Sequence, residues 1–112
     1  MVIVDDNAGF RSAATALLEA GGLRVIGEAA TGQAAVEAVR TLRPDIVLLD
    51  IQLPDVDGFE VCGRLRHQTA VVLCSVRTAA DFGNRVEESG AVGFIPKARL
   101  SAAGLLGLVE RR

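Results

Sequence analysis

The chain has 112 residues and a mass of 11.7 kDa, so we expect one domain over residues 1–112 with its own hydrophobic core. Half of its residues are hydrophobic and 23% are charged, a composition typical of globular rather than disordered proteins. The formal net charge of −2 excludes a general nucleic-acid binder, because there is no basic surplus to neutralise phosphates. No apolar run approaches the roughly 20 residues that span a bilayer.

The chain also lacks the marks of export and of thiol chemistry. Asp5 and Asp6 lie where the apolar segment of a signal peptide would have to be. The two cysteines, Cys62 and Cys74, lack the CxxC spacing of metal or redox pairs and lie within apolar patterns. These features predict a cytoplasmic protein with reduced core cysteines and no membrane partner.

Five short apolar runs predict β-strands. The runs at 46–49 and 71–74 are continuously apolar, as in strands that are buried on both faces of a parallel sheet. The other runs are shorter or mixed in character. The predicted strands cover residues 2–4, 24–28, 45–49, 70–74 and 91–95.

Helical periods separate these strands. Apolar residues between 10 and 18 follow a helical stripe, which Gly21 and Gly22 end. The fifth helix contains Gly104 and Gly107, each of which costs about 1 kcal/mol relative to alanine, so it is predicted to be short or to need a partner surface. Five βα units in order predict an α/β, doubly wound fold with a parallel sheet and right-handed crossovers. The remaining helical patterns cover residues 35–42, 59–65, 79–86 and 102–109.

Polar residues follow four of the predicted strands. In open α/β sheets, ligands bind beyond the carboxyl ends of the strands. Each residue alone has an ordinary explanation: a helix cap for the aspartates, a turn for the acid or the serine, and a solvated surface for the lysine. Their joint placement favours one common site, and Lys97 is the only lysine of the chain. The residues are Asp5 with Asp6, Asp50, Ser75 and Lys97.

Clustered carboxylates indicate a bound cation. Two unit charges 4 Å apart repel by about 4 kcal/mol at an effective dielectric of 20. Oxygen ligands in small number suit Mg²⁺, which keeps several waters and accepts phosphate oxygens. The charges of Asp5, Asp6 and Asp50 balance those of Mg²⁺ and Lys97, and a phosphoryl dianion on Asp50 would leave a net charge of about −1. The site can hold that product, so we expect Asp50 to act as a carboxylate nucleophile on phosphorus.

The chain resembles the receiver domain of bacterial two-component response regulators over its whole length. The residues that carry the resemblance are the acids at 5–6, the segment 45–50, the loop 53–58, Ser75 and the segment 93–97. The segments 27–32 and 90–94 are most similar to receivers of helix-turn-helix DNA-binding regulators. The resemblance implies a flavodoxin-like (βα)5 fold with strand order 2-1-3-4-5.

The resemblance also implies roles for single residues. Asp50 would accept a phosphoryl group from a sensor histidine kinase, beside Mg²⁺ held by Asp5, Asp6, Asp50 and the backbone carbonyl of Gln52. Lys97 would contact the phosphate. Ser75 and Phe94 would act as the switch pair, re-posing a face made of the fourth helix, the fifth strand and the fifth helix. That face is a possible homodimer surface, and DNA would be reached only indirectly, through an effector domain outside this chain.

Two departures from the family and two alternatives remain. Ala98 follows Lys97 where family members often have proline, and Val76 is larger than the usual residue beside the switch serine. One alternative is a receiver-like interaction scaffold that does not use phosphate. The other is a Mg²⁺-dependent aspartyl-phosphate phosphatase, although a second acid two residues after Asp50 is missing. The chain could stand alone or be a piece of a longer regulator.

Overall fold

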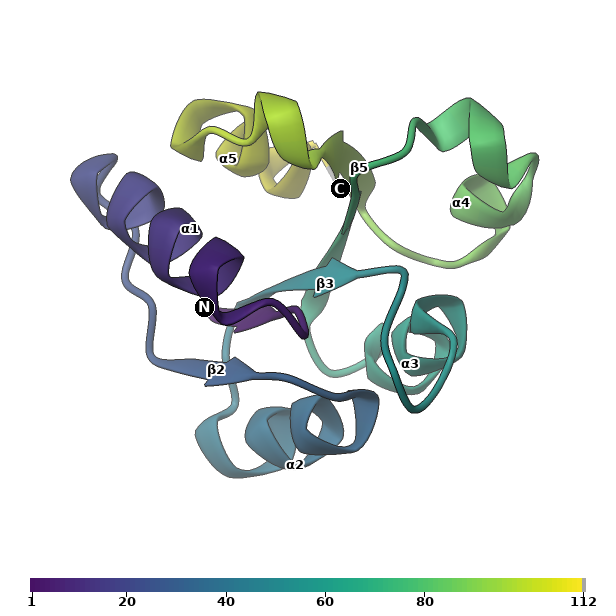
Figure 1. The fold of residues 1–112 in the computed structure, drawn as a ribbon, viewed down its shortest axis with the longest axis horizontal. Helices are drawn as coiled ribbons and strands as arrows, with labels where there is room; N and C mark the ends of the chain where they lie inside the picture. The colour runs from purple at the N-terminus through teal and green to yellow at the C-terminus, as the bar shows by residue number, and fades with distance from the viewer. Residues whose placement is uncertain (112) are drawn as a thin grey trace.

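A single five-stranded parallel sheet organises the protein (Figure 1). The computed structural model describes residues 1–111. The strand order β2-β1-β3-β4-β5 confirms the predicted doubly wound, flavodoxin-like topology. The strands are β1 (Val2–Val4), β2 (Gly27–Ala29), β3 (Ile46–Asp50), β4 (Ala70–Ser75) and β5 (Gly93–Pro96).

Helices cover both faces of this sheet (Figure 1). They are α1 (Ala8–Ala20), α2 (Gly32–Leu42), α3 (Gly58–Leu65), α4 (Arg85–Glu88) and α5 (Ala102–Glu110). Short 3₁₀ turns, η1 (Ala79–Phe82) and η2 (Lys97–Arg99), precede α4 and α5. Helices α1 and α5 lie on one face, and α2, α3 and α4 lie on the other. None of the helices in residues 1–111 has both the length and the apolar character to cross a membrane.

Alternate residues of the central strands point into the two hydrophobic layers. Val47 and Leu49 pack toward the face with α2 and α3, whereas Leu48 packs toward the face with α1 and α5. All five residues of β3 and all six of β4 are buried, as their continuous apolar sequence predicts. The central strands therefore form a rigid base for the loops at their carboxyl ends.

The predicted fourth helix over 79–86 is wrong as a continuous element. Gly83 interrupts it with φ 59° and ψ −130°, a conformation outside the helical region. The apolar residues keep a helical spacing across Gly83 although the backbone does not, so the spacing alone does not reveal the break. Neither η1 nor α4 contains a buried residue, so this segment is the least anchored of those that cover the sheet.

Two other predicted boundaries also need comment. The second strand begins at Gly27 rather than at residue 24 and ends at Ala29, so the prediction of 24–28 was too early. The fifth helix forms in spite of its two glycines. Its N-cap Ser101 accepts a hydrogen bond from the Gly104 N–H at 3.0 Å, and Leu105 is fully buried beneath it.

Both cysteines are buried and unpaired by disulfides. Burial is the main cause that raises the pKa of the Cys74 thiol to about 12. Burial also raises the pKa of Cys62. Both thiols are therefore held in their protonated form, in agreement with the predicted core role.

Gly58 lets the start of α3 approach the end of β3. A Cβ at this position would lie 2.5 Å from the Ile51 Cα and 2.6 Å from the Asp50 carbonyl oxygen. The Gly58 N–H also donates to the Ile51 carbonyl at 2.8 Å. No rotamer change relieves a clash with backbone atoms, so any side chain here must displace the loop that follows Asp50.

Gly58→Ala should therefore lower the free energy of unfolding by about 1–3 kcal/mol. Gly63→Ala is the matched control, because Gly63 lies in the same helix with nothing within 4 Å of an added Cβ. This control should raise the free energy of unfolding by roughly 0.5–1 kcal/mol. Urea unfolding measures both, and equal effects of the two variants would contradict the backbone clash.

Candidate functional site

The strand ends bring the predicted site residues to one edge of the sheet. Asp5 follows β1, Asp50 ends β3, Ser75 ends β4 and Lys97 follows β5. The strands are parallel, so these four ends meet at the carboxyl edge. Asp50 and Ser75 are the last residues of strands that are otherwise apolar, which explains why polar groups are buried here.

A buried ion-pair cluster lies at this edge. The Lys97 Nζ lies 2.5 Å from Asp5 Oδ2 and 3.4 Å from Asp50 Oδ2. The Asp5 side chain is completely buried, and the Asp50 and Lys97 side chains are 6% and 16% exposed. Lys97 thus supplies the positive charge that two buried carboxylates need.

Backbone N–H groups fix the orientation of both acids. The Asn7 N–H donates to Asp5 Oδ1 at 2.9 Å, and the Gln52 N–H donates to Asp50 Oδ1 at 3.1 Å. In each case the oxygen that faces away from the donor is the one beside Lys97. The two carboxylates are therefore held in defined directions before any ligand binds.

The electrostatics of the cluster shift two pKa values. Burial raises the pKa of Asp50, and the negative charge of Asp5 adds to the effect, while the Gln52 N–H and Lys97 oppose it. Burial lowers the pKa of the Lys97 ammonium, but its close contact with Asp5 and the charges of Asp50 and Asp5 outweigh burial and raise it. Lys97 is therefore charged at neutral pH.

Asp6 completes a group of acids that could hold a metal ion. Oxygen atoms of Asp5, Asp6 and Asp50 all lie within 4.8 Å of one another. At that separation each pair of charges repels by roughly 3.5 kcal/mol at an effective dielectric of 20. Asp5 Oδ2 is buried without a hydrogen-bond partner, and its close contact is the ion pair with Lys97. An oxygen-only donor set with this excess of negative charge fits Mg²⁺.

Ser75 is fully buried at the end of β4. Its Oγ accepts a hydrogen bond from the Arg77 N–H at 3.1 Å, the local loop bond that most serines make. The neighbouring Val76 is 75% exposed, so its side chain projects largely into solvent. Phe94 in β5 is half-buried and packs on the layer beneath α3 and α4, with its ring centroid 6.4 Å from that of Phe82.

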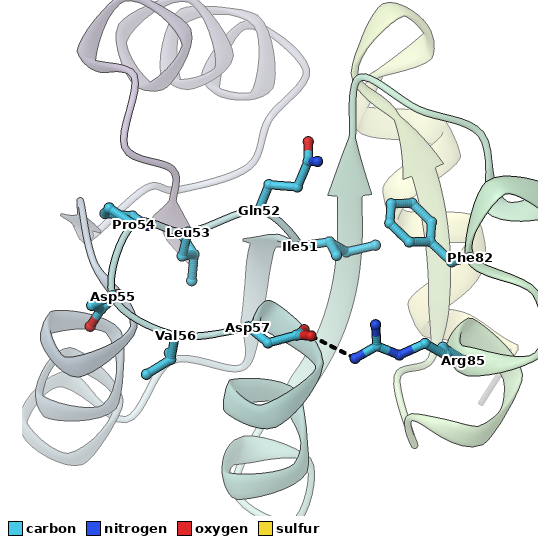
Figure 2. A pocket seen from close by; sticks show the side chains of 9 residues that line it. All are labelled: Ile51, Gln52, Leu53, Pro54, Asp55, Val56, Asp57, Phe82 and Arg85. Carbon is cyan, nitrogen blue, oxygen red and sulfur yellow. Dashed lines mark hydrogen bonds and ion pairs between the residues drawn. The ribbon is translucent and has the colours of Figure 1, made fainter.

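The loop of residues 51–57 joins β3 to α3 and faces Phe82 of η1 and Arg85 of α4 (Figure 2). Asp57 caps α3 by accepting from the Phe59 N–H and forms a 2.6 Å ion pair with Arg85. The Arg85 guanidinium also lies over the Phe59 ring, 4.2 Å from its centroid. A shallow cavity of about 480 Å³ lies between this loop and α4. The Gln52 side chain points away from Arg85 (Figure 2).

A second acid of the same loop ties it to the start of α2. The Asp55 carboxylate accepts from the Gly32 and Gln33 N–H groups at 2.8 and 3.1 Å. These two hydrogen bonds hold the pKa of Asp55 below its ordinary value. The loop that carries Gln52 is thus fixed at both of its acidic residues.

Sequence reasoning missed several residues that shape the site. Arg11 donates to the Asp5 carbonyl at 2.6 Å and to Glu28 at 2.9 Å, which ties α1 to β2 beneath the acids. The N-cap of α1 is Asn7, not an aspartate. Phe10, which the helical stripe assigned to packing, lies under the Lys97 ammonium. The contacts of Arg11 with Glu28 and of Phe10 with Lys97 join parts of the chain that are far apart, so residue spacing carries no signal for them. The Asn7 cap is local, and an asparagine just before a helical stripe is a signal that could have found it.

The fold and this edge define a class of protein. Residues 1–106 match the response regulator receiver domain family, so the chain belongs to that family.

Known relatives agree with this assignment. The chain is 32% identical to the response regulator GacA of Pseudomonas viridiflava over 98% of its own length and 51% of that protein. It is 34% identical to a protein-glutamate methylesterase/protein-glutamine glutaminase of Alkalilimnicola ehrlichii, over 99% of its length and 30% of the relative. The chain thus spans about half of the first relative and less than a third of the second.

Solved structures show the same architecture. The signal receiver domain of NarL from Mycobacterium tuberculosis superposes with a TM-score of 0.89 at 30% identity, covering 99% of this chain and 95% of that one. The BeF3-activated receiver domain of Klebsiella pneumoniae RstA gives a TM-score of 0.82 at 32% identity, covering 96% and 92%.

Magnesium should stabilise the folded protein. At ten times its dissociation constant, Mg²⁺ should raise the free energy of unfolding by about 1.4 kcal/mol. Asp6→Asn should raise the Mg²⁺ concentration needed for this effect at least about tenfold. Loss of a residue that only hydrogen-bonds to a metal ligand already lowers metal affinity by about that factor. Asp6 is exposed, so this variant should fold.

Asp45→Asn removes the same charge at the opposite edge of the sheet and should keep the full response. Thermal unfolding over a Mg²⁺ titration measures all three proteins. An unchanged response in Asp6→Asn would contradict the metal site.

Proposed function

We propose that this chain receives a phosphoryl group on Asp50 from a sensor histidine kinase and transmits a conformational signal. The observation that carries the proposal is the contact of one ammonium, Lys97, with both buried acids at the carboxyl edge of the sheet. Membership of the receiver family supports it. An interaction scaffold without phosphate would have no need for a buried, oriented cluster of this charge.

In the proposed reaction, a carboxylate oxygen of Asp50 attacks the phosphorus atom. A bond from phosphorus to oxygen forms, the bond to the donor's leaving group breaks, and that group departs with the electron pair. Bound Mg²⁺, held by Asp5, Asp6, Asp50 and the Gln52 carbonyl, would neutralise charge on the transferring group. Lys97 and the Ser75 hydroxyl would hold phosphoryl oxygens in place.

The structure supports these roles by position and by charge. The Gln52 N–H holds one Asp50 oxygen, which leaves the other on the side of Lys97. Lys97 is charged, so it can stay beside the dianionic phosphoryl group after the transfer. The Ser75 Oγ only accepts from the Arg77 N–H, so its hydroxyl hydrogen is available to donate to a phosphoryl oxygen.

A small acyl phosphate tests the reaction without a kinase. Acetyl phosphate with Mg²⁺ should add one phosphate to the wild type, seen by intact mass, and none to Asp50→Asn. Asp45→Asn should label like the wild type, because Asp45 precedes β3 at the far edge. A wild type that stays unlabelled, or an Asp50→Asn variant that labels equally, would refute the proposal.

The proposed output lies outside the described residues. In this proposal an effector domain outside this chain would control transcription and contact DNA; the matched region covers about half of GacA, which leaves room in that relative for a further domain. The proposed internal readout is the face of α4, β5 and α5, which would change self-association or partner docking. Catalysis would be limited to Asp50 phosphorylation and dephosphorylation.

The weakly anchored η1–α4 segment supports a switch at this face. It holds no buried residue, and its ion pair between Arg85 and Asp57 is about half exposed and so contributes little. A row of rings connects it to the sheet: Phe82 lies 5.6 Å from Phe59 and 6.4 Å from Phe94 between ring centroids. A shift of Phe94 would therefore be transmitted to η1 through direct contact.

Phe94→Leu should keep Asp50 labelling within about twofold but lose at least half of the phosphorylation-dependent change in hydrogen exchange across residues 79–96. Leucine preserves apolar volume, so the fold should persist. Leu17→Ala, on the exposed surface of α1, should keep the full change. A Phe94→Leu protein with a wild-type exchange change would remove Phe94 from the switch.

A further inference from the structure

The ring of Phe10 forms one wall of the lysine site. The Lys97 Nζ lies 4.5 Å from the ring centroid, over its face. An ammonium within about 6 Å of an aromatic face is attracted by the negative potential of the ring. Lys97 therefore has three close contacts: two carboxylates and one aromatic face.

The position of this ring is set by the same short segment that orients Asp5. The Asn7 side chain caps α1 by accepting from the Phe10 N–H at 2.9 Å. The Asn7 backbone N–H donates to Asp5 Oδ1 at 2.9 Å. Asp5, Asn7 and Phe10 therefore form one connected unit that places a carboxylate and a ring around the same ammonium.

We infer that Phe10 is a positioning residue that keeps the Lys97 ammonium directed at the phosphoryl site. The inference rests on the proposed function, because it assigns Lys97 the task of meeting the phosphoryl group. Its physical basis is a competition. Bound Mg²⁺ would compete with Lys97 for the carboxylates of Asp5 and Asp50, whereas the ring does not bind Mg²⁺. Of the three contacts of Lys97, the one with the Phe10 ring is therefore the contact that would persist when Mg²⁺ binds.

A packing role alone makes a different prediction. Phe10 is half-buried against the layer of α1 and α5, so any apolar side chain of similar size would satisfy that layer. The attraction of an ammonium depends instead on electron density at the ring face. Fluorination lowers that density and hardly changes the volume, so it separates the two roles.

The first experiment measures the maximal rate of Asp50 labelling by acetyl phosphate at saturating Mg²⁺. Phe10→Leu should lower it by about two- to tenfold, and Phe10→Tyr should retain it. Mono-, di- and trifluorophenylalanine at position 10 should lower the rate in steps. Phe59→Leu is the matched control, because that ring faces Arg85 instead, and its rate should match the wild type.

The second experiment reads the contact without any reaction. Lys97 is the only lysine, so ¹³C-lysine labelling gives the signals of a single lysine side chain in the NMR spectrum. The ring should shift the Lys97 Cε protons upfield, and Phe10→Leu should abolish this shift with and without Mg²⁺. Phe10→Tyr and Phe59→Leu should preserve it.

The outcomes separate the inference from the function on which it rests. An unlabelled wild type refutes phosphoacceptance, and the NMR comparison then still decides whether the ring holds Lys97. If the wild type labels and Lys97→Met slows labelling, but fluorination leaves the rate unchanged, the inference is overturned. A Lys97 signal that is identical in wild type and Phe10→Leu also overturns it.

Discussion

The site depends on one buried cluster of ion pairs. Lys97 follows β5, and its ammonium offsets the repulsion of Asp5 and Asp50, which follow or end strands on the other side of β4. These acids can be buried only because the parallel strands all end at one edge of the sheet. There the Lys97 ammonium, which follows the outer strand β5, reaches both carboxylates. Every other feature of the site supports this cluster: the Asn7 and Gln52 N–H groups orient the acids, and the Phe10 ring bounds the ammonium.

This arrangement leaves an excess of negative charge that a ligand can use. One ammonium does not balance three neighbouring carboxylates, and the raised pKa of Asp50, caused chiefly by burial, shows that its charged form is disfavoured. In the proposed function, a divalent cation would relieve the repulsion, and Lys97 would offset part of the charge that a phosphoryl group adds. The rigid sheet keeps the acids fixed, whereas the poorly buried η1–α4 segment, connected by Phe82, is free to respond. Under the proposed function, stability and signalling would thus depend on different parts of the fold.

Much of this was predictable from the sequence, because local pattern and chemistry agree. The continuous apolar runs gave β3 and β4 almost to the residue, and the polar groups that follow them gave the edge of the sheet. The fourth helix was mispredicted because periodicity does not report the backbone angles of Gly83. Phe10 was assigned to packing, because its contact with Lys97 joins residues that only the folded chain brings together. The same limit applies to the pair of Asp57 and Arg85.

A crystal structure with Mg²⁺ and beryllium fluoride, a stable stand-in for a phosphoryl group, tests the central claim most directly. The account predicts a metal ion bound by Asp5, Asp6 and Asp50, the fluoride group on an Asp50 oxygen, and the Lys97 ammonium moved from the carboxylates to a fluorine. Metal at another place, or a Lys97 that keeps both carboxylate contacts while Asp50 remains free, would contradict it.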